Sequence, residues 1–436
     1  MGTYRITGRG ASEIAADVEQ AVAGGGLRPG DPLPAMRALA ADLGVNPNTV
    51  AAAYRTLRDR GVITTDGRRG SRVRPRPVTT PRESLGVEIT PDVRDLAGGN
   101  PDPLLLPPLA PVLAALGGDP APVMYGAAGV EESLREVVTA SLAADGVPDG
   151  PLAVTSGALD AVERVLAARL RPGDAVAVED PGWGSLLDLL SALGLRTLPV
   201  ALDDEGPLPD ATAAALRAGA RALVVTARAQ NPTGAAVGAV RARELRTVLA
   251  DRPDVLLVED DHGDGIVDLP LHPLAGATTA WAFVRSGAKA LGPDLRVAHL
   301  TGDPTTVARV AGRLRLGPGW VSHLLQRAVA RLAGTDTGAA ASYRARRAAL
   351  VGELGARGVP ARGRSGLNVW VPVGDETGTV SRLLRDGYAV APGARFRIDS
   401  PPAVRITVSA LTEAEMPEVA EAVARACRLP PARRQG

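Results

Sequence analysis

Lys289 is the single lysine in a chain of 436 residues whose lysine and arginine side chains number 49. An amine can lose its proton and condense with a carbonyl, whereas a guanidinium group stays protonated and forms no useful imine. A covalent bond to an aldehyde is therefore a role that arginine cannot fill. The alternative is compositional drift toward arginine that left one lysine by accident. The residues around position 289 decide between the two.

Further polar or flat side chains follow short aliphatic runs, and they occur at Ser156-Gly157, Trp183, Asn231, Asp260 to His262, and Ser286 with Arg296. A serine and an arginine beside the lysine suit a phosphate monoester, and a carboxylate suits a ring nitrogen that must stay protonated. Each has an ordinary explanation when taken singly, such as core packing for Trp183, a turn for Asn231 and a helix cap for Asp260. Their order and shared position predict instead that Lys289 forms an aldimine with pyridoxal 5′-phosphate (PLP).

The elements that must position these residues are the aliphatic runs themselves. LAVT, AVAVED, RALVVT, VLLVED and WAFVRSG are each of strand length, and most precede a helix-like segment. This alternation predicts a mostly parallel sheet covered by helices on both faces. Ligands of such sheets gather at the carboxyl ends of the strands, where the polar residues lie.

The first 76 residues have a different pattern. Three short amphipathic segments, with a tight turn between the second and third, precede a hairpin with arginines at its turn. This order predicts a winged helix-turn-helix whose third helix presents Asn48 and Thr49 to base edges or phosphates of double-stranded DNA. The wing arginines Arg68 and Arg69 would reach the DNA backbone or the minor groove. A small helical protein-interaction module is the alternative.

Composition limits the class of protein. With 45% apolar and 22% charged residues, the chain has the balance of a globular protein. The formal charge is +1, but residues 1–80 hold 12 arginines against 7 acidic residues, a net of +5. Cys427 is the one cysteine, and the four histidines are too dispersed for a metal site. We find no signal peptide and no long apolar stretch, so we expect a cytoplasmic protein with no membrane partner.

Residues 27–73 resemble the DNA-binding domain of GntR-type bacterial regulators. The resemblance rests on the segments PG-x-x-LP-x-x-R-x-LA and LGV-x-x-x-TV and on a glycine-rich wing. It implies that Arg37 contacts DNA. Many relatives have a basic residue where Pro47 stands, so part of the base reading would be absent or would move to Arg55.

Residues 95–436 resemble the aspartate-aminotransferase-like fold of fold type I PLP enzymes, and the whole chain resembles the MocR/GabR-type subfamily of GntR regulators. The implied architecture is a winged helix-turn-helix at 1–76, a linker at 77–94, and a PLP-binding domain at 95–436. That domain has a large α/β part at about 120–330, with a mostly parallel sheet, and a smaller α+β part at about 331–436 plus 95–119. The implied cofactor-binding residues are Lys289, Asp260, Asn231, Trp183, Gly157, Ala158, Ser286, Arg296 and Tyr125.

Within this set the resemblance assigns separate roles. Asn231 bonds the ring hydroxyl, Trp183 stacks on the ring, and Gly157, Ala158, Ser286 and Arg296 hold the phosphate. Tyr125 reaches the phosphate of the other subunit, which implies a homodimer. Arg405 grips the carboxylate of an amino acid effector or substrate.

His262 departs from the family, which usually has a tyrosine at this position that shares the ring-hydroxyl bond with Asn231. The imidazole would either donate that bond or point away and serve a structural purpose.

From the two resemblances together we expect a transcriptional regulator that senses PLP, an amino acid or an amine through the aldimine on Lys289. The alternative is an active aminotransferase that carries a DNA-binding appendage, and a third possibility is a regulator whose PLP site is vestigial.

Overall fold

The structure is a computed structural model of the chain, and it describes residues 4–23, 26–28, 30–59, 62–65, 70–73, 82, 90–118 and 122–428. Arg68 and Arg69, predicted at the wing turn, lie outside the described residues, as does most of the predicted linker. Over the described ranges, no helix is both long and apolar enough to cross a bilayer.

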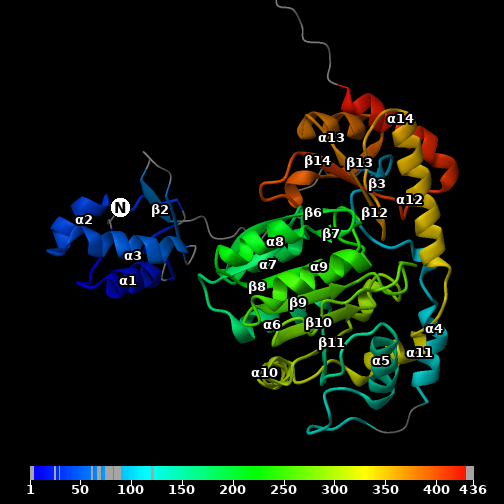
Figure 1. Cartoon of the computed structure of the whole chain (residues 1–436), viewed down its shortest axis with the longest axis horizontal. Coiled ribbons are helices and arrows are strands. Elements are labelled where there is room, and N and C mark those ends of the chain that lie inside the picture. Colours follow the sequence, from blue (N-terminus) through cyan, green and yellow to red (C-terminus); the bar gives the residue numbers. More distant parts are fainter. Residues whose placement is uncertain are drawn as a thin grey trace, which may run out of the picture.

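The N-terminal unit is a helix-turn-helix followed by a hairpin (Figure 1). Its elements are α1 (Ala11–Ala23), α2 (Met36–Leu43), α3 (Pro47–Asp59) and the antiparallel strands β1 (Ile63–Thr65) and β2 (Ser71–Val73). Gly44 ends α2 in the left-handed region, at φ 64°. Asn46 Oδ1 then accepts the backbone N–H of Asn48 at 2.9 Å as α3 begins. The apolar faces of the helices meet in one core that contains Ile14, Val50 and Leu57.

A mostly parallel sheet forms the centre of the rest of the described chain (Figure 1). In spatial order its strands are β4 (Leu152–Thr155), β11 (Ala298–Gly302), β10 (Ala280–Ser286), β9 (Leu256–Asp261), β8 (Ala220–Arg228), β5 (Ala175–Asp180), β6 (Arg196–Asp203) and β7 (Gly206–Pro207). β11 runs antiparallel to β10 and β4, and β7 runs antiparallel to β6. The five aliphatic runs of the sequence form β4, β5, β8, β9 and β10.

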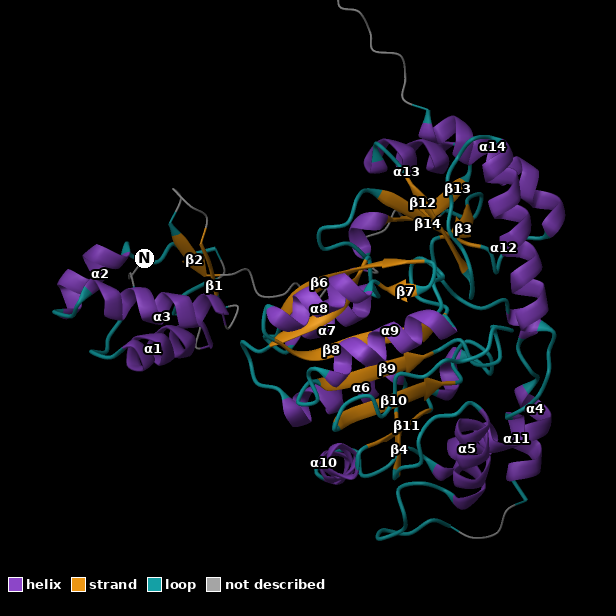
Figure 2. Ribbon diagram, viewed as in Figure 1, coloured by secondary structure: helices purple, strands orange, loops and turns teal. Residues whose placement is uncertain are grey.

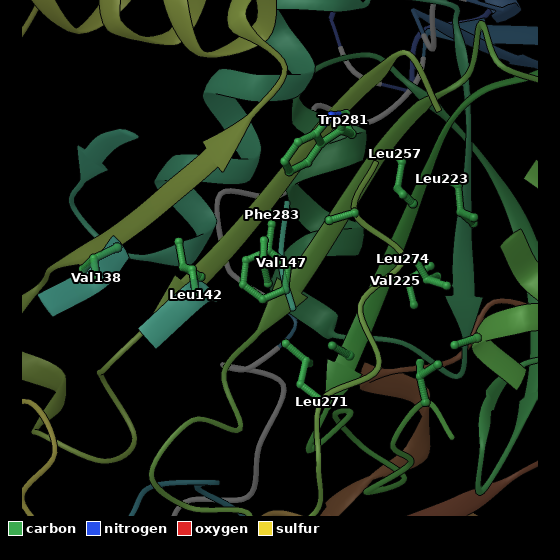
Figure 3. Packing of buried hydrophobic residues seen from close by; sticks show 14 of the residues in the cluster. Val138, Leu142, Val147, Leu223, Val225, Leu257, Leu271, Leu274, Trp281 and Phe283 are labelled. Carbon is green, nitrogen blue, oxygen red and sulfur yellow. The ribbon is translucent and has the colours of Figure 1, made fainter. Parts of the chain in front are cut away.

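Helices cover both faces of this sheet (Figure 2). Successive residues of a strand point to opposite faces. Leu257 and Phe283 therefore pack with α5, α8, α9 and α11 (Figure 3), whereas Val258 and Val284 pack with α6, α7 and α10. The helices are α5 (Glu132–Ala144), α6 (Ala158–Arg169), α7 (Gly184–Ala192), α8 (Pro209–Arg217), α9 (Ala239–Ala250), α10 (Pro304–Arg315) and α11 (His323–Leu332). A strand buried on both sides needs aliphatic residues at every position, which explains the unbroken apolar runs.

A smaller sheet belongs to the C-terminal part of the chain and has the strand order β12-β14-β13-β3. Its strands are β12 (Asn368–Pro372), β14 (Ala403–Thr407), β13 (Tyr388–Pro392) and β3 (Arg94–Leu96). The helices α12 (Ala339–Ala356), α13 (Glu376–Arg385) and α14 (Met416–Cys427) pack on it. β3 comes from far upstream in the sequence and pairs in parallel with β13. A further helix, α4 (Leu109–Leu116), lies between β3 and the large sheet in the sequence.

Candidate functional site

The carboxyl ends of neighbouring strands bring several predicted site residues together. Asp260 in β9 is in register with Thr226 of β8 and with Val284 of β10. Ser286 is the last residue of β10, and Lys289 follows in a turn. The site thus lies at the edge of the large sheet where parallel-sheet proteins bind ligands.

Asp260 and His262 form a buried pair at this edge. Asp260 is 3% exposed, and its Oδ2 lies 2.9 Å from His262 Nδ1. The other ring nitrogen, Nε2, lies 2.9 Å from the backbone oxygen of Ala229. A carbonyl oxygen only accepts, so Nε2 carries a proton and donates it to Ala229. Both ring nitrogens of His262 are therefore engaged by the protein itself.

The charge of His262 follows from these two contacts. Burial lowers the pKa of the imidazole, but the charge and hydrogen bond of Asp260, with the bond to Ala229, outweigh burial and raise the pKa above 6.5. A protonated His262 donates from both nitrogens, to Asp260 Oδ2 and to the backbone oxygen of Ala229. Among the described residues, Asp260 Oδ1 is buried and has no hydrogen-bond partner.

Arg405 and Asn231 meet from opposite parts of the chain. Arg405 lies in β14 of the small sheet and is 5% exposed, and its Nη1 donates to Asn231 Oδ1 at 3.0 Å. Its guanidinium group also lies 4.8 Å from the ring centroid of Phe396. Because the amide oxygen of Asn231 accepts from Arg405, the amide nitrogen is the atom that can donate to a ligand.

Lys289 and Arg405 both contact the short segment that follows β3. Lys289 Nζ donates to Gly99 O at 2.7 Å, and Arg405 Nη2 donates to Ala97 O. Gly99 has a φ of 66°, and a Cβ at this position would lie 3.0 Å from Arg405 Nη2. Glycine is thus needed here both for its backbone conformation and for the close approach of the guanidinium group.

Gly157 and Arg296 meet at the start of α6, close to the row of the sheet that contains Ser286. Across β11, Ala298 is in register with Ser286 on one side and with Thr155 on the other, so Ser286 and the end of β4 lie two strands apart in the same row. Arg296 Nη2 donates to the carbonyl of Ser156, and a Cβ on Gly157 would lie 2.5 Å from that nitrogen. Ala158 begins α6, whose first backbone N–H groups are the predicted phosphate ligands.

Trp183 reaches this group of residues, but Tyr125 does not. Trp183 caps α7, and its ring centroid lies 6.4 Å from that of His262. Tyr125 is 95% exposed and packs edge-on against Trp320, with 5.8 Å between the ring centroids. Both rings line a cavity of about 1480 Å³. Within one chain, Tyr125 is therefore separate from the other predicted cofactor residues.

Sequence reasoning missed the residues that hold Asn231 in place. Glu179 is 3% exposed and accepts the N–H of Thr226 at 3.0 Å and the side-chain amide of Gln230 at 3.1 Å. Gln230 in turn accepts from Thr233 N at 3.0 Å, which closes the turn around Asn231. Burial raises the pKa of Glu179 to about 7. The acidic residue before Asp180 in AVAVED was the available signal, because a carboxylate in an otherwise apolar strand needs buried donors.

A buried ion-pair cluster behind the site was also missed. Asp261 is 0% exposed and lies 2.7 Å from Arg228 Nη2 and 2.9 Å from Arg285 Nη2. Arg285 also pairs with Asp145 of the loop after α5 at 2.6 Å. Burial raises the pKa of Asp261, but the two arginines outweigh burial and lower it. The cluster fixes the end of β9 next to Asp260.

The predicted DNA-contacting side chains of the described N-terminal unit are accessible. Arg37 on α2 is exposed, as are Asn48 and Arg55 on α3, and Thr49 is partly exposed. They lie outside the helical core, where a nucleic acid can reach them.

Comparisons with known proteins agree with both halves of the chain. Residues 11–73 match the gntR family of bacterial regulatory proteins, and residues 124–423 match aminotransferase class I and II. The vitamin B6 salvage pathway transcriptional repressor PtsJ of Salmonella typhimurium is 40% identical, over 94% of this chain and 97% of that protein. The HTH-type pyridoxine biosynthesis transcriptional regulator PdxR of Corynebacterium glutamicum is 30% identical, over 70% of this chain and 68% of that protein.

The solved kynurenine aminotransferase of Pyrococcus horikoshii shares the fold. It has a TM-score of 0.71 at 23% identity, and the match covers 78% of this chain and 91% of that chain. The predicted fold class is thereby confirmed. The chain belongs to the MocR/GabR-type subfamily of GntR transcriptional regulators, in which a DNA-binding winged helix-turn-helix is fused to an aminotransferase-like domain.

Proposed function

We propose that this regulator binds double-stranded operator DNA and that PLP, an amino acid or an amine held in the aminotransferase-like part controls this binding. The printed names of PtsJ and PdxR place those two relatives in the control of vitamin B6 salvage and pyridoxine biosynthesis. Since PLP is the active form of vitamin B6, PLP itself is the first signal to test. A cytoplasmic location follows from the proposed DNA partner.

The observation that carries the proposal is the unpartnered oxygen of Asp260. A buried carboxylate oxygen without a donor is unfavourable. The described protein supplies a donor to Oδ2 through His262 and none to Oδ1. A protonated pyridine nitrogen is a donor of the right charge for Oδ1. His262 donates to the other oxygen of the same carboxylate, and the one lysine of the chain is close enough for its charge to act on His262.

The other residues fit the remaining groups of PLP. Asn231 would donate its amide N–H to the ring hydroxyl, and Trp183 would cover the ring. Gly157, Ala158, Ser286 and Arg296 would hold the phosphate. When bound, PLP supplies an electrophilic aldehyde that reacts with amines, and Lys289 is the amine that the chain offers.

His262 is proposed as a positioning residue rather than as a direct ligand of the ring hydroxyl. Its Nε2 proton already goes to Ala229 and its Nδ1 faces Asp260. Asn231 is then left to bind the hydroxyl without the usual second donor. Such a site would hold the cofactor with its ring nitrogen protonated. With one donor fewer on the ring hydroxyl, the reactivity of the aldehyde would differ from that in a typical aminotransferase.

A homodimer is also proposed. Tyr125 is the predicted phosphate ligand that lies apart from its own site, and its side chain is exposed. A second copy of the chain would present this tyrosine to the phosphate group. The mass of the particle in solution, measured by light scattering with and without PLP, tests this arrangement.

The decisive experiment measures binding of the full chain to DNA from immediately upstream of its own gene. Fluorescence anisotropy is recorded with and without PLP at low and moderate salt, together with the absorbance of the protein-bound cofactor. We expect affinity to fall steeply with salt and to change with PLP. Lys289→Arg should abolish the absorbance of the covalent cofactor and the response to PLP while leaving DNA binding without PLP intact. An unchanged spectrum in this variant would refute the role of Lys289.

An active aminotransferase with a DNA-binding appendage is the second candidate. The retention of Asp260, Lys289 and a buried Arg405 favours it, because these residues suffice in principle to bind an amino acid and move a proton. Repeated conversion of the bound cofactor to pyridoxamine phosphate by an amino acid, with release of the keto acid, would support this function. A single conversion without turnover would support sensing alone.

A further inference from the structure

Four arginines from four separate segments line one cavity of about 440 Å³. Arg58 comes from the last turn of α3, Arg82 from the region between the N-terminal unit and β3, Arg196 from the start of β6, and Arg397 from the loop before β14. None of them belongs to the proposed cofactor site. Guanidinium groups repel one another, so their convergence needs an explanation.

The carboxylates nearby balance only part of this charge. Arg82 pairs with Asp188 at 3.0 Å, and Arg397 pairs with Glu376 at 3.1 Å. Among the described ion pairs, two carboxylates thus face four guanidinium groups, which leaves a net charge of two positive units. Arg196 donates its Nε to the backbone oxygen of Gly173, which neutralises no charge.

One unpartnered donor accompanies the charge. Arg397 Nε is buried and has no hydrogen-bond partner within the described part of the chain. The hydroxyl-bearing residues Ser191 and Thr197 line the same cavity. A buried N–H without an acceptor is unfavourable, so Arg397 Nε lacks an acceptor beside a cavity whose arginines are only partly balanced by carboxylates.

We propose that this cavity is a second anion site and that it takes a phosphate group, either free phosphate or the phosphate of a small monoester. A phosphate dianion matches the uncompensated charge, and its tetrahedral oxygens accept the paired N–H groups of arginine forks. A bound phosphate would join the end of α3 to the large sheet and to the loop before β14 of the smaller sheet. It would thereby restrict the DNA-binding unit relative to the aminotransferase-like part.

The test uses the full chain with Arg296→Gln as background, because that change removes the arginine predicted to bind phosphate in the cofactor site. Inorganic phosphate is titrated by calorimetry at constant ionic strength into this variant and into two derivatives. One derivative adds Arg196→Gln. The other adds Arg221→Gln, a matched control that removes an exposed arginine near the same end of the sheet but outside the cavity.

We expect saturable binding that Arg196→Gln weakens at least tenfold and that Arg221→Gln changes less than twofold. No saturable binding in the background variant, or equal binding in both derivatives, would overturn the proposal. If Arg196→Gln alters the circular dichroism spectrum, Arg58→Gln on the exposed face of α3 replaces it.

A parallel titration with phenyl phosphate distinguishes free phosphate from a phosphate monoester as the ligand. Tighter binding of phenyl phosphate than of phosphate identifies a monoester site, and weaker binding identifies a free-phosphate site. The site does not depend on PLP, so its failure would leave the proposed function untouched.

Discussion

Replacement of His262 by phenylalanine should lower the free energy of unfolding by about 3 kcal/mol. The variant removes the donor to a carboxylate that is 3% exposed and also leaves the Ala229 carbonyl without its donor. Removing one partner of a buried charge pair costs about 3–5 kcal/mol in other proteins, and the partly exposed imidazole places this site at the low end. The ring of phenylalanine fills most of the space, so little of the loss comes from a cavity.

His323→Phe is the matched control. His323 is 9% exposed, whereas the side chain of His262 is 16% exposed. Nε2 of His323 lies 2.9 Å from the backbone oxygen of Ala128, and the structure shows no carboxylate bonded to it among the described residues. Loss of one hydrogen bond to a backbone oxygen should cost about 1 kcal/mol. The difference between the two variants isolates the contribution of the charge on Asp260.

The effect of pH gives a second criterion. The pKa of His262 is raised in the folded chain above its ordinary value of 6.5, because Asp260 outweighs the opposing effect of burial. The stabilisation from its charge is thus fully present below pH 6.5 and is lost as pH rises through the folded pKa. His262→Phe should therefore destabilise the chain more at pH 6 than at pH 9.

Urea unfolding followed by tryptophan fluorescence measures both variants, because Trp183 lies beside His262 and Trp320 lies beside His323. The reasoning is refuted if His262→Phe costs no more than His323→Phe at pH 6. It is also refuted if the cost of His262→Phe rises toward pH 9, since that would mean that the imidazole pairs with Asp260 in its neutral form.

Three further predictions address the proposed phosphate ligand Gly157, the proposed DNA contact Arg55 and the buried acid Glu259. Gly157→Ala should weaken PLP binding at least tenfold in a spectroscopic titration, because its Cβ would lie 2.5 Å from Arg296 Nη2; Gly146→Ala, also at positive φ but with no atom within 4 Å, should leave PLP affinity unchanged. Arg55→Ala should weaken operator binding and reduce the slope of log affinity against log salt by about one, and an unchanged slope would remove Arg55 from the contact surface. Burial raises the pKa of Glu259 to about 7 from 4.5, so the folded chain keeps a proton that the unfolded chain loses, and stability falls as pH rises from 4.5 to 7. Glu259→Gln should remove about 3 kcal/mol of that fall in urea unfolding at pH 4.5 and pH 7, and an unchanged difference would contradict the assignment.

The sequence predicted the strands of the large sheet where both faces are buried. LAVT and VLLVED are uninterrupted aliphatic runs because helices cover them on both sides, and they form β4 and β9. β6 and β11 were not predicted. β6 has the burial of an outer strand, with its first residue, Arg196, exposed, and β11 contains His299, so neither has an unbroken aliphatic pattern.

Local sequence patterns indicated the candidate site residues, whereas residues linked by contacts between distant parts of the chain were not predicted. Lys289 and Asp260 stand at strand ends within recognisable motifs. Glu179 acts through Gln230, which lies 51 positions later in the chain, and no local pattern connects the two. For His262, the sequence left a direct and a structural role open, and only the fold placed its two nitrogens between Asp260 and Ala229.

The segment that follows β3 has a consequence for how a signal leaves the ligand site. Ala97 and Gly99 are held through their backbone oxygens by Arg405 and Lys289, the two side chains expected to meet the ligand. A ligand that engages either side chain competes with the chain's own backbone for the same donor. The segment would then be released when a ligand takes these donors. Because β3 directly precedes this segment and pairs with β13, displacement of the segment would act first on the edge of the small sheet.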